Sequence, residues 1–193
     1  MISSSIQNYK FAEKSLYIYE NVPDHLQIKK NNFGYGLYSN KKINKGESIV
    51  KQGFIIFQEE LIDKIFLISN NNEYEINKHI HGDYNNMNDK KMWIGTYTCF
   101  LNHSCDPNIT YQSLNDEYLT DYVAIKDIEE GEELTMNYNS FIAEWTEPLK
   151  CQCNSHSCMK EIKGYKFLDE IEREKINKTL INFDIEELQK SCE

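Results

Sequence analysis

Three cysteines within eight positions constrain this chain more than any other feature of its sequence. Cys151, Cys153 and Cys158 form a C-x-C-x4-C pattern in a segment with few apolar side chains. Thiolates this close in sequence can bind one zinc ion, and zinc binding supplies folding energy that such a segment lacks. The alternative is three free thiols at the surface. A tetrahedral site needs a fourth ligand, and the spacing leaves open Cys99, Cys105, His156 and Cys192.

The composition describes one globular domain in a reducing compartment. The chain has 193 residues, of which 40% are hydrophobic and 27% are charged, as in proteins that bury a single core. Its densest apolar run spans only 54–57, and its first residues lack the apolar stretch of a signal peptide, so no membrane segment is predicted. We therefore expect an intracellular protein, in which six cysteines indicate metal or free thiols rather than disulfides.

The charge balance bears on the kind of partner. The formal net charge is −10 at pH 7. An acidic surface repels phosphate backbones, so direct binding to nucleic acid is disfavoured. The same surface attracts basic partners, and we expect a protein or peptide that carries lysine or arginine.

The first half of the chain is predicted to contain short strands after a loose beginning. Residues 1–27 are polar and aromatic with weak periodicity, which predicts a loosely attached lead-in with at most one short helix. Apolar residues alternating with glycine predict a strand at 33–38, and apolar runs predict strands at 48–52 and 54–57. Apolar positions spaced as on one helix face predict a short helix over 58–68.

The second half is predicted to be mixed. A polar stretch over 77–91 predicts a long loop. Strands are predicted over 118–125 and 133–138, on either side of a turn at 129–131. The chain becomes helical after residue 165, and Asp184 with Glu187 resembles the capping box that opens a last helix.

Three further motifs carry groups suited to a binding site. Segment 102–108 reads Asn-His-Ser-Cys-Asp-Pro-Asn, which taken alone is also compatible with an Asx-turn around a buried cysteine. Segment 33–36 reads Phe-Gly-Tyr-Gly, and segment 132–138 reads Glu-Glu-Leu-Thr-Met-Asn-Tyr. Each of these two is weak by itself, because most such sequences are ordinary turns and core strands.

Together, in this order, these motifs and the cysteine cluster resemble the SET-domain lysine methyltransferases that carry a post-SET zinc segment. The resemblance covers about residues 28–165, and segment 102–108 is its most specific element. It implies a mainly β fold with some α, a SET-type β-clip of small sheets with a pseudoknot, followed by a zinc-bound tail and C-terminal helices. The implied divisions are a lead-in over 1–27, a SET domain over 28–144, a post-SET segment over 145–167 and a helical tail over 168–193.

The resemblance also implies S-adenosylmethionine as the cofactor. Glycine suits the strand that lies against it, because a Cβ there would block a close approach. The Asn-His pair of segment 102–108 would hold the amino and adenine portions of the cofactor. The implied cofactor-binding residues are Gly34, Tyr35, Gly36, Leu37, Asn102, His103 and Tyr138, of which Tyr138 matches the catalytic tyrosine.

For the structural zinc, the resemblance selects Cys105 as the fourth ligand beside Cys151, Cys153 and Cys158. This choice would tie the Asn-His motif to the tail, which would then cover the cofactor and complete a lysine channel. Aromatic walls for that channel are expected from Tyr165 or Phe167, although both residues are equally compatible with ordinary helix packing.

Two positions depart from the family pattern or are not determined by it. Met136 stands two residues before Tyr138, where many relatives carry Phe or Tyr, and this position affects how many methyl groups fit. A second active-site tyrosine is usual in the family. Tyr74 and Tyr97 are candidates for it, and no motif selects between them.

These inferences predict an S-adenosylmethionine-dependent protein-lysine N-methyltransferase that acts on a basic, lysine-containing protein or peptide, such as a histone tail. The alternatives are methylation of a non-histone protein, a catalytically inactive SET-like module that binds peptide, and a small zinc-stabilised interaction protein. No direct nucleic-acid or membrane partner is expected. A histone-directed enzyme would act in the nucleus, and one with another substrate in the cytoplasm.

Overall fold

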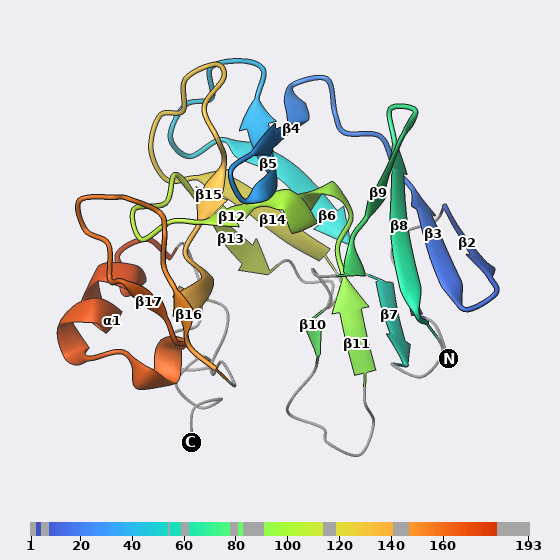
Figure 1. Ribbon diagram of the computed structural model, residues 1–193. Helices are drawn as coiled ribbons and strands as arrows, with labels where there is room; N and C mark the ends of the chain where they lie inside the picture. The colour runs from blue at the N-terminus through green and yellow to red at the C-terminus, as the bar shows by residue number, and fades with distance from the viewer. Residues whose placement is uncertain are drawn as a thin grey trace.

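The computed structural model describes residues 3–4, 8–53, 55–58, 62–77, 81–82, 91–113, 119–140 and 147–180. Over these residues the chain forms many short strands in sheets of two to four strands, and one α-helix (Figure 1). The prediction of a mainly β fold built from small sheets is confirmed.

Two sheets have four strands each. The first has the order β2 (Tyr9–Ala12), β3 (Ser15–Tyr19), β8 (Lys64–Ser69) and β9 (Asn72–Glu75). The second has the order β1 (Ser3–Ser4), β7 (Ile55–Gln58), β11 (Lys91–Ile94) and β10 (His81–Gly82).

The smaller sheets include the glycine strand and the Asn-His motif of the sequence. A three-stranded sheet has the order β13 (Ile109–Ser113), β14 (Leu119–Ala124) and β6 (Ser48–Gly53). The described residues also form three two-stranded pairs: β4 (Leu26–Asn31) with β5 (Gly34–Ser39), β12 (Asn102–His103) with β15 (Thr135–Met136), and β16 (Leu149–Lys150) with β17 (Glu161–Ile162).

The loosely attached lead-in predicted at the N-terminus is wrong for the part that the structure describes. Strand β3 pairs in parallel with β8 inside a four-stranded sheet. Its alternate side chains Leu16 and Ile18 are 0% exposed and belong to the main core. A two-residue period that places apolar side chains on one face is a strand signal, and it was obscured by the polar and aromatic residues between them.

The predicted helix over 58–68 is also wrong, because its second half, 64–68, belongs to strand β8. Ile65, Leu67 and Ser69 alternate as buried residues along that strand. Ile65 fits both a helical and a strand period, so the choice depends on neighbours. Here β3 and β9 satisfy the backbone of β8 on its two sides, which favours the strand.

The polar stretch 77–91 was predicted as a loop, and its short strand β10 corrects part of that prediction. His81 and Gly82 pair with Trp93 and Met92 of β11. The remainder of the stretch, 78–80 and 83–90, lies outside the described residues.

The predicted strand over 133–138 is much shorter than expected. Strand β15 has two residues and pairs in parallel with β12, so that Asn102 lies opposite Thr135 and His103 opposite Met136. It does not form a hairpin with β14, which pairs with β13 and β6. Tyr138 begins the short 3₁₀ helix η4 (Tyr138–Ser140). The Asn-His motif and the segment that leads into Tyr138 therefore lie side by side.

The C-terminal segment 147–180, hereafter the tail, has its own small core. After β16 and β17 it contains the 3₁₀ helix η5 (Tyr165–Phe167) and helix α1 (Glu170–Asn177). Asp169 and Glu172 form a reciprocal capping box that begins α1. The capping residues predicted at positions 184 and 187 lie outside the described residues. In Figure 1 the tail and the β2–β3–β8–β9 sheet lie on opposite sides of the molecule.

Candidate active site and metal centre

A hydrogen bond fixes the orientation of the Tyr138 hydroxyl. It donates a hydrogen bond to the backbone carbonyl of Leu101, at 2.7 Å. The ring packs edge-on against the imidazole of His103, with centroids 5.4 Å apart, and the side chain is half-buried. Burial, with a smaller contribution from Cys99 and Glu133, raises the pKa of Tyr138 well above its usual value, so the phenol stays neutral at physiological pH.

Asn102 is held in place by two acceptors. Its Nδ2 donates to the carbonyl oxygen of Tyr35 at 3.0 Å and to Oε1 of Glu133 at 2.7 Å. The same oxygen of Glu133 accepts from Nδ2 of Asn31 on β4, at 2.8 Å. One carboxylate therefore joins the β4–β5 hairpin to the Asn-His segment. Hydrogen bonds to an ionised acceptor are about twice as strong as those between neutral groups.

Gly36 is required by this clamp. A Cβ at Gly36 would lie 2.2 Å from Oε1 of Glu133 and 2.8 Å from Nδ2 of Asn31. The reason expected for this glycine was a close approach of the cofactor, which a Cβ would block. The structure shows an additional reason within the chain, because any side chain here would displace the carboxylate that holds Asn102.

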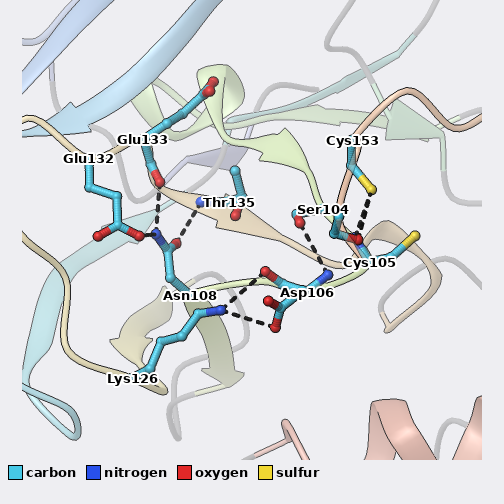
Figure 2. A network of polar contacts seen from close by, with 10 residues as sticks. Ser104, Cys105, Asp106, Asn108, Lys126, Glu132, Glu133, Thr135 and Cys153 are labelled. Atoms are coloured by element: carbon cyan, nitrogen blue, oxygen red, sulfur yellow. Dashed lines mark hydrogen bonds and ion pairs between the residues drawn. The ribbon is translucent and has the colours of Figure 1, made fainter. Parts of the chain in front are cut away.

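Asn108, at the end of the Asn-His motif, uses its whole amide to hold segment 132–135. Figure 2 shows the amide between Glu132 and Thr135. Nδ2 donates to Oε1 of Glu132 at 3.0 Å and to the carbonyl of Glu133 at 2.8 Å, while Oδ1 accepts from the N–H of Thr135 at 2.8 Å. Because Asn108 is 3% exposed, these bonds are protected from water. They place Glu133 where it can reach Asn102.

His103 is neutral and has one defined tautomer. Burial lowers its pKa to about 4. Nδ1 accepts from the backbone N–H of Tyr138 at 3.1 Å, so the ring proton is on Nε2, which lies 3.3 Å from Sγ of Cys105. The imidazole thus connects the turn of Tyr138 to the first of the clustered cysteines.

The thiols gather beside this histidine. Sγ of Cys105 lies 3.7 Å from Sγ of Cys151, and Sγ of Cys153 accepts from the backbone N–H of Cys105 at 3.5 Å. In a tetrahedral zinc site with Zn–S bonds of about 2.3 Å, two sulfurs are about 3.8 Å apart. The spacing of the first two thiols therefore fits one shared zinc ion. Among the described cysteines none forms a disulfide.

The electrostatics of the cluster favour a thiolate at one position. Burial by itself would raise the pKa of Cys153, but hydrogen bonds from the Ser155 hydroxyl and the N–H of Cys105 outweigh it and lower the pKa to about 6. Burial raises the pKa of Cys151 to about 11 and raises that of Cys105 further. A cluster that already favours one anion suits a cation, which would deprotonate the other thiols on binding.

The fourth ligand has two candidates in the structure. The residues whose ligand atoms all lie within 4.8 Å of one another are His103, Cys105, Cys151 and Cys153. The thiol of the predicted ligand Cys158 contacts that of Cys151 and accepts from the N–H of Lys160 at 3.4 Å. His103 was not predicted as a ligand, and its Nε2 could bind a metal only if the ring proton moved to Nδ1, which would break the hydrogen bond from the N–H of Tyr138. Of the other early candidates, Cys192 lies outside the described residues.

The aromatic residues that were candidates for the active site differ in their burial and in their contacts. Tyr74 is half-buried and packs edge-on against Tyr35 and Phe100, whereas Tyr97 is 3% exposed in the main core. Tyr165 is buried in the core of the tail, where its hydroxyl donates to Asn177, and Phe167 is 49% exposed. Tyr165 therefore follows the helix-packing alternative.

Glu133 and Asn31 were not predicted as site residues. Glu133 was within a quoted motif, and its signal was an acidic residue next to the buried Leu134. An inward-facing carboxylate needs partners, and these come from segments 102 and 31 residues away in the sequence. No local pattern marks them.

A glycine strand, an Asn-His segment and a tyrosine turn that meet beside a cysteine cluster define a SET-type domain. The family model of the SET domain matches residues 34–139, more than half of the chain. The chain belongs to the SET domain family.

Curated relatives agree with this assignment. The chain is 31% identical over 134 residues to the histone-lysine N-methyltransferase ash1 of Drosophila melanogaster, with 68% of this chain and 6% of that protein covered. It is 30% identical over 148 residues to the variant-silencing SET domain-containing protein of Plasmodium falciparum, with 69% and 5% covered. A third relative, the histone-lysine N-methyltransferase mes-4 of Caenorhabditis elegans, is 27% identical over 138 residues, with 65% and 15% covered. The chain thus spans a small part of each relative's length.

Among solved structures, the fold is similar to that of KRYPTONITE in complex with mCHG DNA and SAH. The TM-score is 0.50 at 16% identity, with 80% of this chain and 37% of that chain covered. Over the residues that the structure describes, no helix is both long and apolar enough to cross a membrane.

Proposed function

We propose that this protein is an S-adenosylmethionine-dependent protein-lysine N-methyltransferase with Tyr138 as its catalytic residue. The observation that carries the proposal is the hydrogen bond from the Tyr138 hydroxyl to the Leu101 carbonyl. It fixes a neutral phenol oxygen at the carbonyl of the residue before Asn102, so that the proposed catalytic residue and the proposed binding segment are in contact.

The groups at this place suit the proposed cofactor, which is a cation that also carries an amino group. The carboxylate of Glu133 and the carbonyls of Tyr35 and Leu101 all present oxygen atoms around Asn102. Asn102 and His103 are half-buried, and Tyr35 is 43% exposed, so these residues are partly open to solvent. Negative charge and carbonyl dipoles favour a nearby cation.

When bound, the cofactor supplies an electrophilic methyl group. The substrate lysine must lose a proton first, since its amine has an ordinary pKa of about 10.4, and no dedicated general base is evident among the residues placed here. The role of Tyr138 is orientation. The hydrogen bond to Leu101 holds the phenol oxygen in one position, from which it can orient the polarised groups at the reacting centre.

Structural zinc would be held by Cys105, Cys151 and Cys153, completed by Cys158 or His103. Its chemistry is to fix the tail to the Asn-His segment, and it takes no part in methyl transfer. The donor set supports this assignment, because three clustered thiols with one favoured anion suit zinc better than a hard cation.

The proposed substrate is a lysine in a basic protein segment, with histone tails as the first candidate. The net charge of −10 favours a basic partner, and the printed names of two relatives describe histone-lysine methyltransferases. A histone substrate places the activity in the nucleus.

The test is transfer of a labelled methyl group to core histones. Wild-type protein should label lysine, and Tyr138→Phe should lower the rate by about 100-fold or more, while its affinity for S-adenosylhomocysteine stays within about threefold. Tyr17→Phe is the matched control, because Tyr17 stacks on Phe66 in the β2–β3–β8–β9 sheet, and it should transfer normally.

Equal transfer by Tyr138→Phe would overturn the catalytic assignment. Cofactor and peptide binding without any transfer by the wild type would instead identify a SET-like binding module. Transfer to a non-histone protein alone would identify a different substrate for the same reaction.

A further inference from the structure

Asn139, the residue after Tyr138, is completely buried and bonded to the tail. Its side chain is 0% exposed. Oδ1 accepts from the backbone N–H of Lys163 at 3.0 Å and from that of Gly164 at 2.8 Å. The second residue of the tyrosine turn therefore receives two hydrogen bonds from a segment about 25 residues further along the chain.

The side chain of Asn139 works as an acceptor. The backbone N–H of Asn139 donates to Oδ1 of Asn137 at 3.1 Å. Over the described part of the chain, Nδ2 has no hydrogen-bond partner although it is buried. An unsatisfied buried donor costs free energy, so the favourable part of this contact comes from the side-chain oxygen.

The backbone that binds Asn139 has a shape that glycine alone adopts easily. Gly164 has φ 89° and ψ 155°, a region that is almost closed to residues with a Cβ. The next residue is Tyr165, which is 1% exposed. Its hydroxyl donates to Asn177 at 3.1 Å, and its ring lies 5.3 Å below the guanidinium of Arg173. Tyr165 thus links the segment that binds Asn139 to helix α1.

The tail therefore contacts the active-site segment at two separate places. One is the thiol cluster, where Cys151 and Cys153 meet Cys105. The other is the pair of hydrogen bonds to Asn139, which contains no metal ligand. The first adjoins His103, and the second adjoins Tyr138.

We propose that Asn139 is a positioning residue, a metal-independent anchor that holds the tail on the Tyr138 turn and couples docking of the tail to cofactor binding. The inference rests on the proposed function and names a residue that acts for it. If tail docking strengthens cofactor binding, then cofactor must strengthen tail docking by the same factor, because coupling between sites is reciprocal.

The experiment measures both sides of this coupling in the full chain. Hydrogen exchange at the amides of Lys163 and Gly164 reports docking, and calorimetry reports affinity for S-adenosylhomocysteine. In the wild type, saturating S-adenosylhomocysteine should slow exchange at these two amides by about tenfold. Asn139→Ala should speed exchange and weaken affinity by about the same factor. Asn139→Asp keeps an oxygen acceptor and should restore both.

Matched variants separate positioning from general stability. Asn77, which follows strand β9, also uses both ends of its amide on backbone groups, at Ile65 of β8 and at Asp63. Asn77→Ala should lower the melting temperature without changing S-adenosylhomocysteine affinity. Gly164→Ala should reproduce Asn139→Ala, whereas Gly46→Ala, at a similar φ of 88°, should not.

Metal removal tests the independence of the anchor. With a zinc chelator, the amides of Lys163 and Gly164 should still exchange slowly in the wild type. In Asn139→Ala under the same conditions, they should exchange fast. Equal loss in both proteins would show that the metal alone holds the tail. Faster exchange in Asn139→Ala with unchanged S-adenosylhomocysteine affinity would reduce Asn139 to a structural contact.

The proposed function can fail separately. A wild-type chain that binds no S-adenosylhomocysteine would end the proposed function and the coupling with it. Exchange in the variants would still decide whether Asn139 anchors the tail, and fast exchange at these amides in the wild type would overturn that part as well.

Discussion

The backbone N–H of Tyr138 donates a hydrogen bond to Nδ1 of His103, at 3.1 Å. The bond joins the candidate catalytic tyrosine to the Asn-His motif through an imidazole whose other nitrogen faces Cys105. Removing the acceptor should disturb the tyrosine turn first, since a buried N–H without a partner is costly.

We expect His103→Ala to lower kcat by about tenfold, while His103→Asn retains much of it, because the Asn oxygen can replace Nδ1 as the acceptor. Steady-state kinetics measure the difference. Zinc content should be measured on the same samples. Full zinc in both variants would assign the fourth ligand to Cys158, and loss in both would assign it to His103.

Metal binding itself should depend on the tail cysteines. Cys151→Ser should release zinc and make the cysteine segment 147–160 sensitive to proteolysis, because metal binding supplies the folding energy there, whereas residues 163–180 keep their contact with Asn139 and their own small core. Elemental analysis and limited trypsin digestion measure the two effects. Cys99→Ser is the control, since Cys99 lies in the main domain. Unchanged zinc in Cys151→Ser would contradict the ligand assignment.

Asn108→Ala should be strongly destabilising although it removes only a small side chain. It deletes three buried hydrogen bonds and leaves the N–H of Thr135 without its acceptor. We expect a loss of about 3 kcal/mol in the free energy of unfolding, measured by denaturant titration. Asn44→Ala, which removes an exposed contact with Glu47, should change stability by less than about 0.5 kcal/mol.

Gly36→Ala should weaken cofactor binding through Glu133. The new methyl group would displace the carboxylate that holds Asn102. Affinity for S-adenosylhomocysteine should fall by about tenfold or more, which corresponds to about 1.4 kcal/mol. Glu133→Ala should weaken binding too, and adding Gly36→Ala to it should cost little more, because the clash with the carboxylate is then gone and the Asn31 amide, no longer bonded to it, can move away. Additive losses in the double variant would refute this explanation.

Leu16→Ala should show that the N-terminal strands belong to the domain. Leu16 is 0% exposed in the main core, so its truncation should cost about 3 kcal/mol. Phe11→Ala on the neighbouring strand, where the ring is 45% exposed, should cost less than about 1 kcal/mol. A negligible effect at Leu16 would restore the loosely attached lead-in.

The family of this protein could be predicted from short stretches of sequence. The cysteine spacing indicated a metal cluster, and the Asn-His motif with Tyr138 indicated a SET domain, because these side chains act locally and in fixed order. The strands at 33–38, 48–52 and 118–125 were also predictable, since apolar patterning and glycine restrict the backbone within a few residues.

The tertiary structure decided what the same residues contact. Whether 64–69 became helix or strand depended on β3 and β9 beside it. Gly36 was recognisable as important, but its dependence on Glu133 required two segments to meet. Asn139 resembled any polar residue after a tyrosine until the tail folded back onto it. Contacts between distant segments leave no local period, because chain folding, and not spacing, brings the partners together.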